Sequence, residues 1–142
     1  MKEKIYEFEE VIDKLKSCLE IKVKLENRPK KYMFGTNNYG ELVGFINKSD
    51  GDRWDVIVPG YKSLSINKLY KFKNLEGVIL LPNGNHKLII DIYTIYKRNS
   101  IKKQLKEIEN YRDKYEKIVK IKGCIIMFNT HNFKIWLIYY NH

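Results

Sequence analysis

The sequence predicts an α+β domain built on a small antiparallel barrel or a strongly bent sheet, with two helices packed on it. Apolar residues recur at helical spacing over residues 3–19 and 100–117. Between and after these ranges, short segments either alternate apolar and polar residues or form brief apolar runs, as strands do. Turn sequences separate the segments, and Asn83-Gly84 between two apolar runs is typical of a β-hairpin.

The length of 142 residues predicts one domain over residues 1–142. The first predicted helix spans residues 3–19, so we expect residues 1–19 to form an N-terminal helical extension of this domain. The apolar face of this helix consists of Ile5, Phe8, Val11, Ile12, Leu15 and Leu19. Glu and Lys occupy the other face, so the helix is suited to packing on a sheet or to binding a partner.

The remaining elements follow in order along the chain. The predicted strands span residues 21–25, 30–34, 42–46, 54–58, 77–81, 87–93, 119–128 and 133–140. Glycines mark residues 35–40 as a loop, and residues 62–72 have no clear period. Asn99-Ser100 caps a long helix over residues 100–117, whose apolar stripe includes Tyr111 and Tyr115.

The charge of the chain is strongly uneven. The net charge is +10, but residues 1–20 hold six acids and four bases, so the remaining residues carry +12. A body this basic should attract polyanions such as nucleic acid or phosphorylated metabolites. Alanine is absent and Asn, Lys, Ile and Tyr are abundant, which indicates an AT-rich genome that supplies lysine independently of function.

Cysteine use and hydropathy predict where the protein resides. Cys18 and Cys124 lie far apart without metal-ligand spacing, which fits small core residues in a reducing compartment. We expect neither a signal peptide nor a membrane span, because the first residues are charged and amphipathic and no apolar run is long enough to cross a bilayer. We expect a soluble cytoplasmic protein with no membrane partner.

The segment that carries the most chemical information is the acidic loop ahead of the strand at residues 54–58. Asp50, Asp52 and Asp55 crowd around one glycine, and such carboxylates repel one another unless a cation offsets them. Mg²⁺ is commonly held by one or two carboxylates plus phosphate oxygens, so the loop is a candidate metal–phosphate site. The alternative is a solvated turn, and Arg53 could itself neutralise neighbouring carboxylates.

Basic and aromatic residues elsewhere offer candidate phosphate contacts. Arg28, Lys30 and Lys31 form either a phosphate clamp or an exposed basic edge strand. Tyr111 and Arg112 on the long helix either face a phosphate or form an ordinary surface pair.

Two further side chains have mainly structural interpretations. We expect Trp54 to enter the core with the strand that follows it. His86 stands beside the predicted hairpin turn, where we expect an exposed side chain.

The acidic loop also carries a family resemblance. Asp50-Gly51-Asp52-Arg53-Trp54-Asp55-Val56 resembles the signature of the first family of soluble inorganic pyrophosphatases, Asp-Gly-Asp-Pro-apolar-Asp-apolar. Other segments resemble that family in the same order, over about residues 20–122: Pro29-Lys30-Lys31-Tyr32, Gly44-Phe45-Ile46, Gly77-Val78-Ile79, Gly84 to Lys87 and Asn110-Tyr111-Arg112.

The resemblance implies a distorted OB-like β-barrel with packed helices, and hydrolysis of pyrophosphate assisted by several Mg²⁺ ions. Carried over by position, it implies metal binding by Asp50, Asp52 and Asp55, with Asp52 and Asp55 also catalytic. It implies phosphate binding by Lys31, Lys87, Tyr111 and Arg112.

The sequence also departs from the family pattern. Arg53 replaces the signature proline, and the turn at residues 82–86 has no carboxylate where the family has further metal ligands. Lys22 and Met33 stand where glutamates are expected, and residues 124–140 have strand character where a terminal helix is expected. Because carboxylates are lost and cations kept, we expect a basic pocket that binds phosphate and holds fewer Mg²⁺ ions.

Two functions remain open at this point. The first is a divergent pyrophosphatase-like protein that binds Mg²⁺ and pyrophosphate or a related phosphoanhydride, with weak or lost hydrolysis. The second is a non-catalytic basic barrel that binds nucleic acid or a protein partner. The amphipathic first helix and the apolar C-terminal strands are both suited to a homo-oligomer interface.

Overall fold

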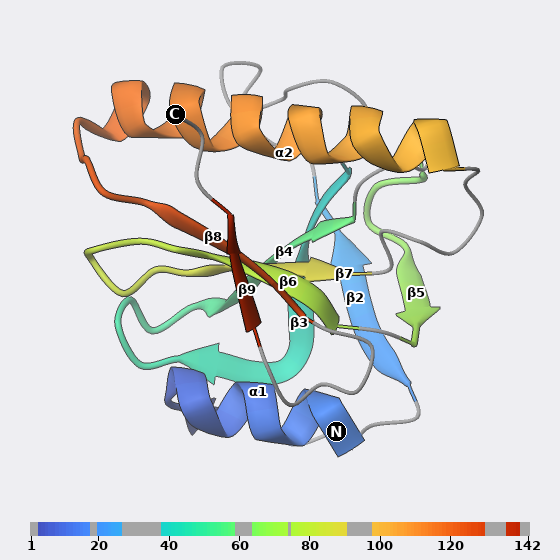
Figure 1. Cartoon of the computed structure of the whole chain (residues 1–142). Helices are drawn as coiled ribbons and strands as arrows, with labels where there is room; N and C mark the ends of the chain where they lie inside the picture. Colours follow the sequence, from blue (N-terminus) through green and yellow to red (C-terminus); the bar gives the residue numbers. More distant parts are fainter. Residues whose placement is uncertain are drawn as a thin grey trace.

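The computed structural model describes residues 3–17, 20–26, 38–58, 64–73, 75–90, 98–129 and 136–139. In these ranges a curled sheet lies between two helices, with α1 (Phe8–Ser17) on one side and α2 (Arg98–Val119) on the other (Figure 1). The predicted strand at residues 30–34 and Cys18 lie outside the described residues.

Nine strands are described: one precedes helix α1, six lie between the two helices and two follow helix α2. They are β1 (Lys4–Tyr6), β2 (Ile21–Leu25), β3 (Asn38–Asn47), β4 (Arg53–Val58), β5 (Leu69–Phe72), β6 (Leu75–Leu80), β7 (Lys87–Ile90), β8 (Ile125–Asn129) and β9 (Trp136–Tyr139). The α+β class predicted from the sequence is therefore confirmed.

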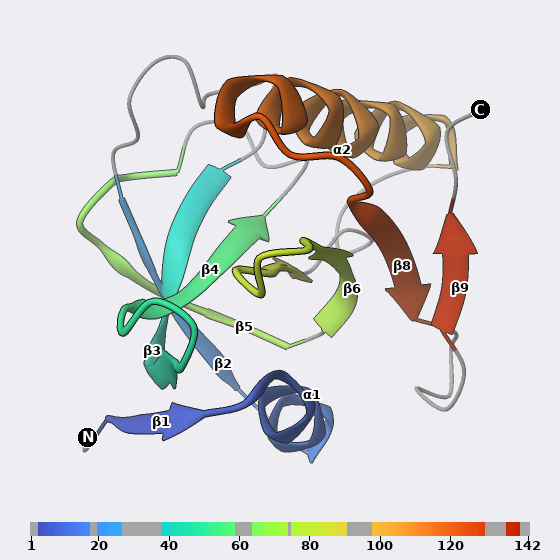
Figure 2. The same cartoon turned by 90° about the vertical axis from the view of Figure 1, so that its left-hand side faces the viewer.

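The strands form one sheet with the order β5-β2-β3-β4-β7-β6-β8-β9, and β1 pairs with β3 beside this path. Over the described ranges the path ends at β5 and β9, so the structure is an open, curled sheet rather than a closed barrel (Figure 2). Most of the described strand pairs are antiparallel, as expected, but β1–β3 and β4–β7 are parallel, so the sheet is mixed. The strong bend is confirmed.

The N-terminal segment differs from the predicted helix over residues 3–19. Lys4–Tyr6 add to β3 as a parallel strand, and helix α1 begins only at Phe8. The Glu7 N–H donates to Glu10 Oε1 at 3.1 Å, a capping interaction that favours a helix start at this point. Ile5, assigned to the apolar helix face, is instead 66% exposed.

The observed bounds of strand β3 and helix α2 also differ from the predicted ones. β3 begins at Asn38, so residues 38–40 of the predicted loop are strand. The hairpin of β6 and β7 forms as predicted, with Gly84 at a φ of 83° in its turn. Helix α2 extends two residues beyond the prediction at each end, and Lys120 terminates it with a φ of 55°. A left-handed residue just after the last turn commonly ends a helix.

The core has two layers because β4 and β7 are buried on both faces. On the α1 face, Val11, Ile12 and Leu15 pack near Trp54, Val56, Leu88 and other strand residues. On the α2 face, Ile108, Tyr111 and Tyr115 pack with Ile57, Ile89 and their neighbours. Alternation along β4 and β7 therefore decides which side chains face which helix.

Cys124 belongs to the α2 layer, as expected for a small core residue. It is buried, and burial together with the nearby Glu116 carboxylate raises the pKa of its thiol to about 12. No helix among the described ranges is both long and apolar enough to cross a membrane.

Candidate functional site

A row of charged residues crosses three neighbouring strands on the α2 side of the sheet. Glu41 on β3 lies opposite Asp55 on β4, and Asp55 lies opposite Lys87 on the parallel strand β7. Because side chains alternate along a strand, Asp55 and Lys87 share the face of Ile57 and Ile89, which pack toward α2. The sheet register thus assembles charges that are far apart in the sequence.

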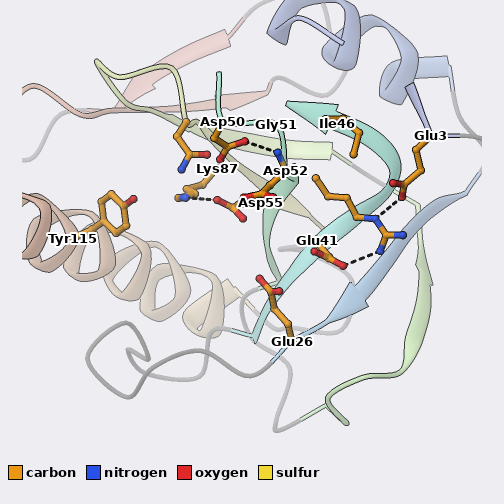
Figure 3. A pocket seen from close by; sticks show the side chains of 12 residues that line it. Glu3, Glu26, Glu41, Ile46, Asp50, Gly51, Asp52, Asp55, Lys87 and Tyr115 are labelled. Atoms are coloured by element: carbon orange, nitrogen blue, oxygen red, sulfur yellow. Dashed lines mark hydrogen bonds and ion pairs between the residues drawn. The ribbon is translucent and has the colours of Figure 1, made fainter. Parts of the chain in front are cut away.

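This row lies in a cavity of about 670 Å³. Its lining, drawn in Figure 3, consists of Glu3, Glu26, Glu41, Ile46, Asp50, Gly51, Asp52, Arg53, Asp55, Asn85, Lys87 and Tyr115. Six carboxylates therefore face two cations, for a formal charge of −4. The expected basic pocket is wrong for the described residues, because β3 and the N-terminal segment supply glutamates that sequence spacing did not reveal.

Lys87 is enclosed by its neighbours. Its Nζ donates to Asp55 Oδ2, and the two side chains are only 2% and 15% exposed. The same nitrogen lies 5.9 Å from the ring centroid of Tyr39 and 5.2 Å from that of Tyr115. At these distances the aromatic faces attract the ammonium. Lys87, a predicted phosphate ligand, thus lines the cavity with its charge directed at a carboxylate.

Arg53 connects two glutamates from separate segments. Its Nη1 donates to Glu41 Oε1 at 2.8 Å, and its Nε donates to Glu3 Oε1. Partial burial acts to lower the pKa of Arg53, but hydrogen bonds and attraction from Glu3 and Glu41 outweigh it, so the pKa is raised. Arg53 does pair with carboxylates, but its partners are these two glutamates and not the neighbouring aspartates of the loop.

The acidic turn presents Asp50 and Asp52 at the cavity. The Asp52 N–H donates to Asp50 Oδ1 at 2.9 Å, and Gly51 supplies the left-handed φ of 77° that the turn requires. Asn47 holds the turn from within the sheet, since its N–H donates to the Asp52 carbonyl and its own carbonyl accepts from the Gly51 N–H at 2.9 Å. Both aspartates are exposed.

The predicted phosphate ligands on α2 lie differently from Lys87. Tyr111 is buried, with its ring centroid 6.3 Å from that of Tyr39 and 5.9 Å from that of Tyr115. Arg112 is also buried and donates to Asp113 at 3.0 Å. Neither Tyr111 nor Arg112 is among the lining residues, whereas Tyr115, one helical turn later, is. Lys31 lies outside the described residues, and the binding roles of all these side chains stay predictions.

Trp54 and His86 occupy the opposite, α1 side. Trp54 is 1% exposed, as predicted. His86, expected to be exposed, is half-buried, with its ring centroid 4.7 Å from that of Phe8 and 6.4 Å from that of Trp54. Its Nδ1 accepts the Leu81 N–H at 2.9 Å. Burial first, and then the Lys87 charge, lower the pKa of His86.

Comparison with known proteins supports the fold relationship. No family model matches the sequence, and no curated protein matches it. The structure is similar to the crystal structure of an inorganic pyrophosphatase from Neisseria gonorrhoeae, with a TM-score of 0.54. The two sequences are 19% identical, and the similarity covers 83% of this chain and 82% of the other. The likeness establishes a pyrophosphatase-like fold.

A pyrophosphatase-like fold raises the question of whether these residues suit resident metal ions. Glu41 and Asp55 are ion-paired with Arg53 and Lys87. Across the described ranges, no three His, Cys, Asp or Glu side chains lie close enough together to hold a metal ion. The described part of the cavity therefore does not fit a resident multi-metal centre.

Proposed function

We propose that this protein is a divergent inorganic-pyrophosphatase-like protein that binds pyrophosphate or a related phosphoanhydride as its magnesium complex, with weak or lost hydrolysis. The observation that carries the proposal is that Asp50, Asp52, Asp55 and Lys87 line one cavity in a pyrophosphatase-like fold. The ligand is a phosphoanhydride because two exposed carboxylates at the turn, Asp50 and Asp52, suit a hydrated Mg²⁺ that phosphate oxygens also bind.

Charge explains why the ligand would be the magnesium complex. A free polyphosphate anion would meet a lining with a formal charge of −4 and would be repelled. Mg²⁺ bound to the ligand would turn this repulsion into attraction, because Asp50 and Asp52 can bind the metal. Both aspartates are exposed and form no ion pair within the described part of the chain. Mg²⁺ arrives here as part of the ligand, not as a resident ion.

Weak hydrolysis follows from the state of Asp55. A carboxylate that activates water must accept a hydrogen bond from that water, and Asp55 Oδ2 already accepts one from Lys87 Nζ. The Lys87 ammonium is paired with Asp55, so it stabilises less well the negative charge that develops on the phosphate oxygens in the transition state of hydrolysis. Both groups predicted to act on the phosphoanhydride are therefore engaged with each other.

The test is calorimetric titration with pyrophosphate in the presence and absence of Mg²⁺, together with an assay of phosphate release. We expect Mg²⁺-dependent binding that Asp52→Asn weakens, and little release. Asp13→Asn on the exposed face of α1 is the matched control and should bind like the wild type. Absence of Mg²⁺-dependent binding, or an equal loss in both variants, would contradict the proposal.

The charge outside the cavity favours a second candidate, a non-catalytic protein that binds nucleic acid. The chain has 27 basic and 17 acidic residues, of which two basic and six acidic residues belong to the described lining. The other 25 basic and 11 acidic residues give the rest of the chain a formal charge of +14. A surplus of this size should neutralise several phosphates and bind DNA or RNA with a steep salt dependence. Fluorescence anisotropy with single-stranded DNA and RNA at several salt concentrations tests this, and a flat response would exclude it.

A further inference from the structure

We infer that Arg53 and Lys87 are built-in counter-cations that occupy the cavity's carboxylates in place of resident divalent metal ions. The inference concerns the protein without ligand, so it holds or fails independently of phosphoanhydride binding. It rests on how two cations are fitted into the charged row across β3, β4 and β7.

The row would be unstable without counter-charges. Glu41 and Asp55 are directly opposite each other on antiparallel strands, where like charges are destabilising. A sheet that places two carboxylates in this way needs a cation near each of them. Divalent ions with a preference for oxygen ligands, such as Mg²⁺ and Mn²⁺, are one solution.

This chain supplies the cations from its own strands. Lys87 is aligned with Asp55 by the β4–β7 register and reaches it from the next strand. Arg53 lies two residues before Asp55 on β4, so it projects from the same face and reaches Glu41. Its second contact, to Glu3, brings a third carboxylate into the same arrangement. Figure 3 shows these contacts on neighbouring parts of the cavity wall.

The arrangement has a consequence for metal affinity. A divalent ion that bridged Glu41 and Asp55 would have to displace one of the paired cations or sit beside it. A guanidinium group binds carboxylates through directed hydrogen bonds and keeps its proton in proteins. Arg53 therefore competes with divalent ions for Glu41 and Glu3. Removing its charge should leave Glu41 and Glu3 without their partner and open the cavity to a divalent ion.

The experiment is Mn²⁺ titration of the phosphate-free protein, followed by electron paramagnetic resonance, with Mg²⁺ competition by calorimetry. We expect weak binding by the wild type and at least about tenfold tighter binding by Arg53→Gln. Arg53→Lys, which keeps the charge, should stay weak. Adding Glu41→Gln to Arg53→Gln should remove the gain. Lys71→Gln, which removes an exposed lysine from β5, controls for net charge.

Three results would overturn the inference. They are an unchanged affinity in folded Arg53→Gln, an equal gain in Lys71→Gln, and saturable binding of Mn²⁺ at micromolar concentration by the wild type. The last measurement needs no variant, so the inference stays testable if circular dichroism shows that Arg53→Gln does not fold.

Discussion

Asp55 on β4 lies directly opposite Lys87 on β7, and their side chains form an ion pair that is almost closed to solvent. The two residues are 32 positions apart in the sequence and meet only because β4 and β7 are parallel neighbours. The rings of Tyr39 and Tyr115 flank the lysine nitrogen. The pair therefore links strands β4 and β7, lines the cavity, and contacts helix α2 through Tyr115.

Breaking this pair from one side should destabilise the protein more than removing both charges. Lys87→Met removes the ammonium that pairs with the largely enclosed Asp55 carboxylate, at a cost of about 3 kcal/mol. The double variant Lys87→Met/Asp55→Asn removes both charges and keeps similar volumes, so we expect most of the loss to be recovered. Urea unfolding of the wild type, both single variants and the double variant measures the coupling. Additive losses would show that the pair does not act as a unit.

Gly40 should not tolerate a side chain. A Cβ at this position would lie 2.7 Å from the Lys24 carbonyl oxygen and 2.8 Å from Val23 Cγ1, because β2 and β3 approach closely there. Gly40→Ala should therefore cost about 2 kcal/mol by overpacking. Gly51→Ala is a useful comparison, since nothing lies within 4 Å and only its φ of 77° is unfavourable. We expect the second loss to be the smaller one in urea unfolding, and the reverse order would contradict the packing argument.

The elements predicted best from the sequence are those with local signals. Three-residue and four-residue spacing located Val11, Ile12 and Leu15 on a helix, and Asn83-Gly84 located the β6–β7 hairpin. Strand β1 was not predicted, because three residues are too few to show the alternation of apolar and polar residues that indicates a strand. In the structure β1 pairs with β3. The parallel pairing of β4 with β7 was likewise invisible, since no local pattern distinguishes a parallel neighbour from an antiparallel one.

The candidate site was predictable only in part for the same reason. The crowded aspartates were found by residue type and Lys87 through the family resemblance, and all four line the cavity. Glu41 was missed because its place opposite Asp55 depends on register between strands. On α2, residues 111 and 115 share one face, so sequence spacing alone could not decide which tyrosine reaches the cavity.

His86 should make stability depend on pH in the mildly acidic range. Its folded-state pKa is lowered, chiefly by burial and then by Lys87, so the unfolded chain binds its proton more readily. The contribution is fully present above the unfolded pKa of about 6.5 and is lost as the pH falls through the lower folded value. Protonation at Nδ1 would also break the bond from the Leu81 N–H.

Thermal unfolding from about pH 7 to about pH 5 tests this expectation. The wild type should lose stability over that range. His86→Gln keeps an acceptor for the Leu81 N–H without a titrating group, so its stability should change less with pH. Parallel curves for the two proteins would assign the pH dependence to other groups.

Tyr115, rather than Tyr111, should contribute to ligand affinity. The side chain of Tyr115 lines the cavity beside Lys87, whereas Tyr111 packs between Tyr39 and Tyr115 behind it. Loss of a phenol hydrogen bond to a charged oxygen costs about 1.5 kcal/mol, so Tyr115→Phe should weaken binding of magnesium pyrophosphate about tenfold. Tyr111→Phe makes the same chemical change one helical turn away and should alter the affinity less than about twofold. Calorimetric titration of both variants decides between the two tyrosines, since a larger loss in Tyr111→Phe would mean that the ligand approaches α2 from outside this cavity.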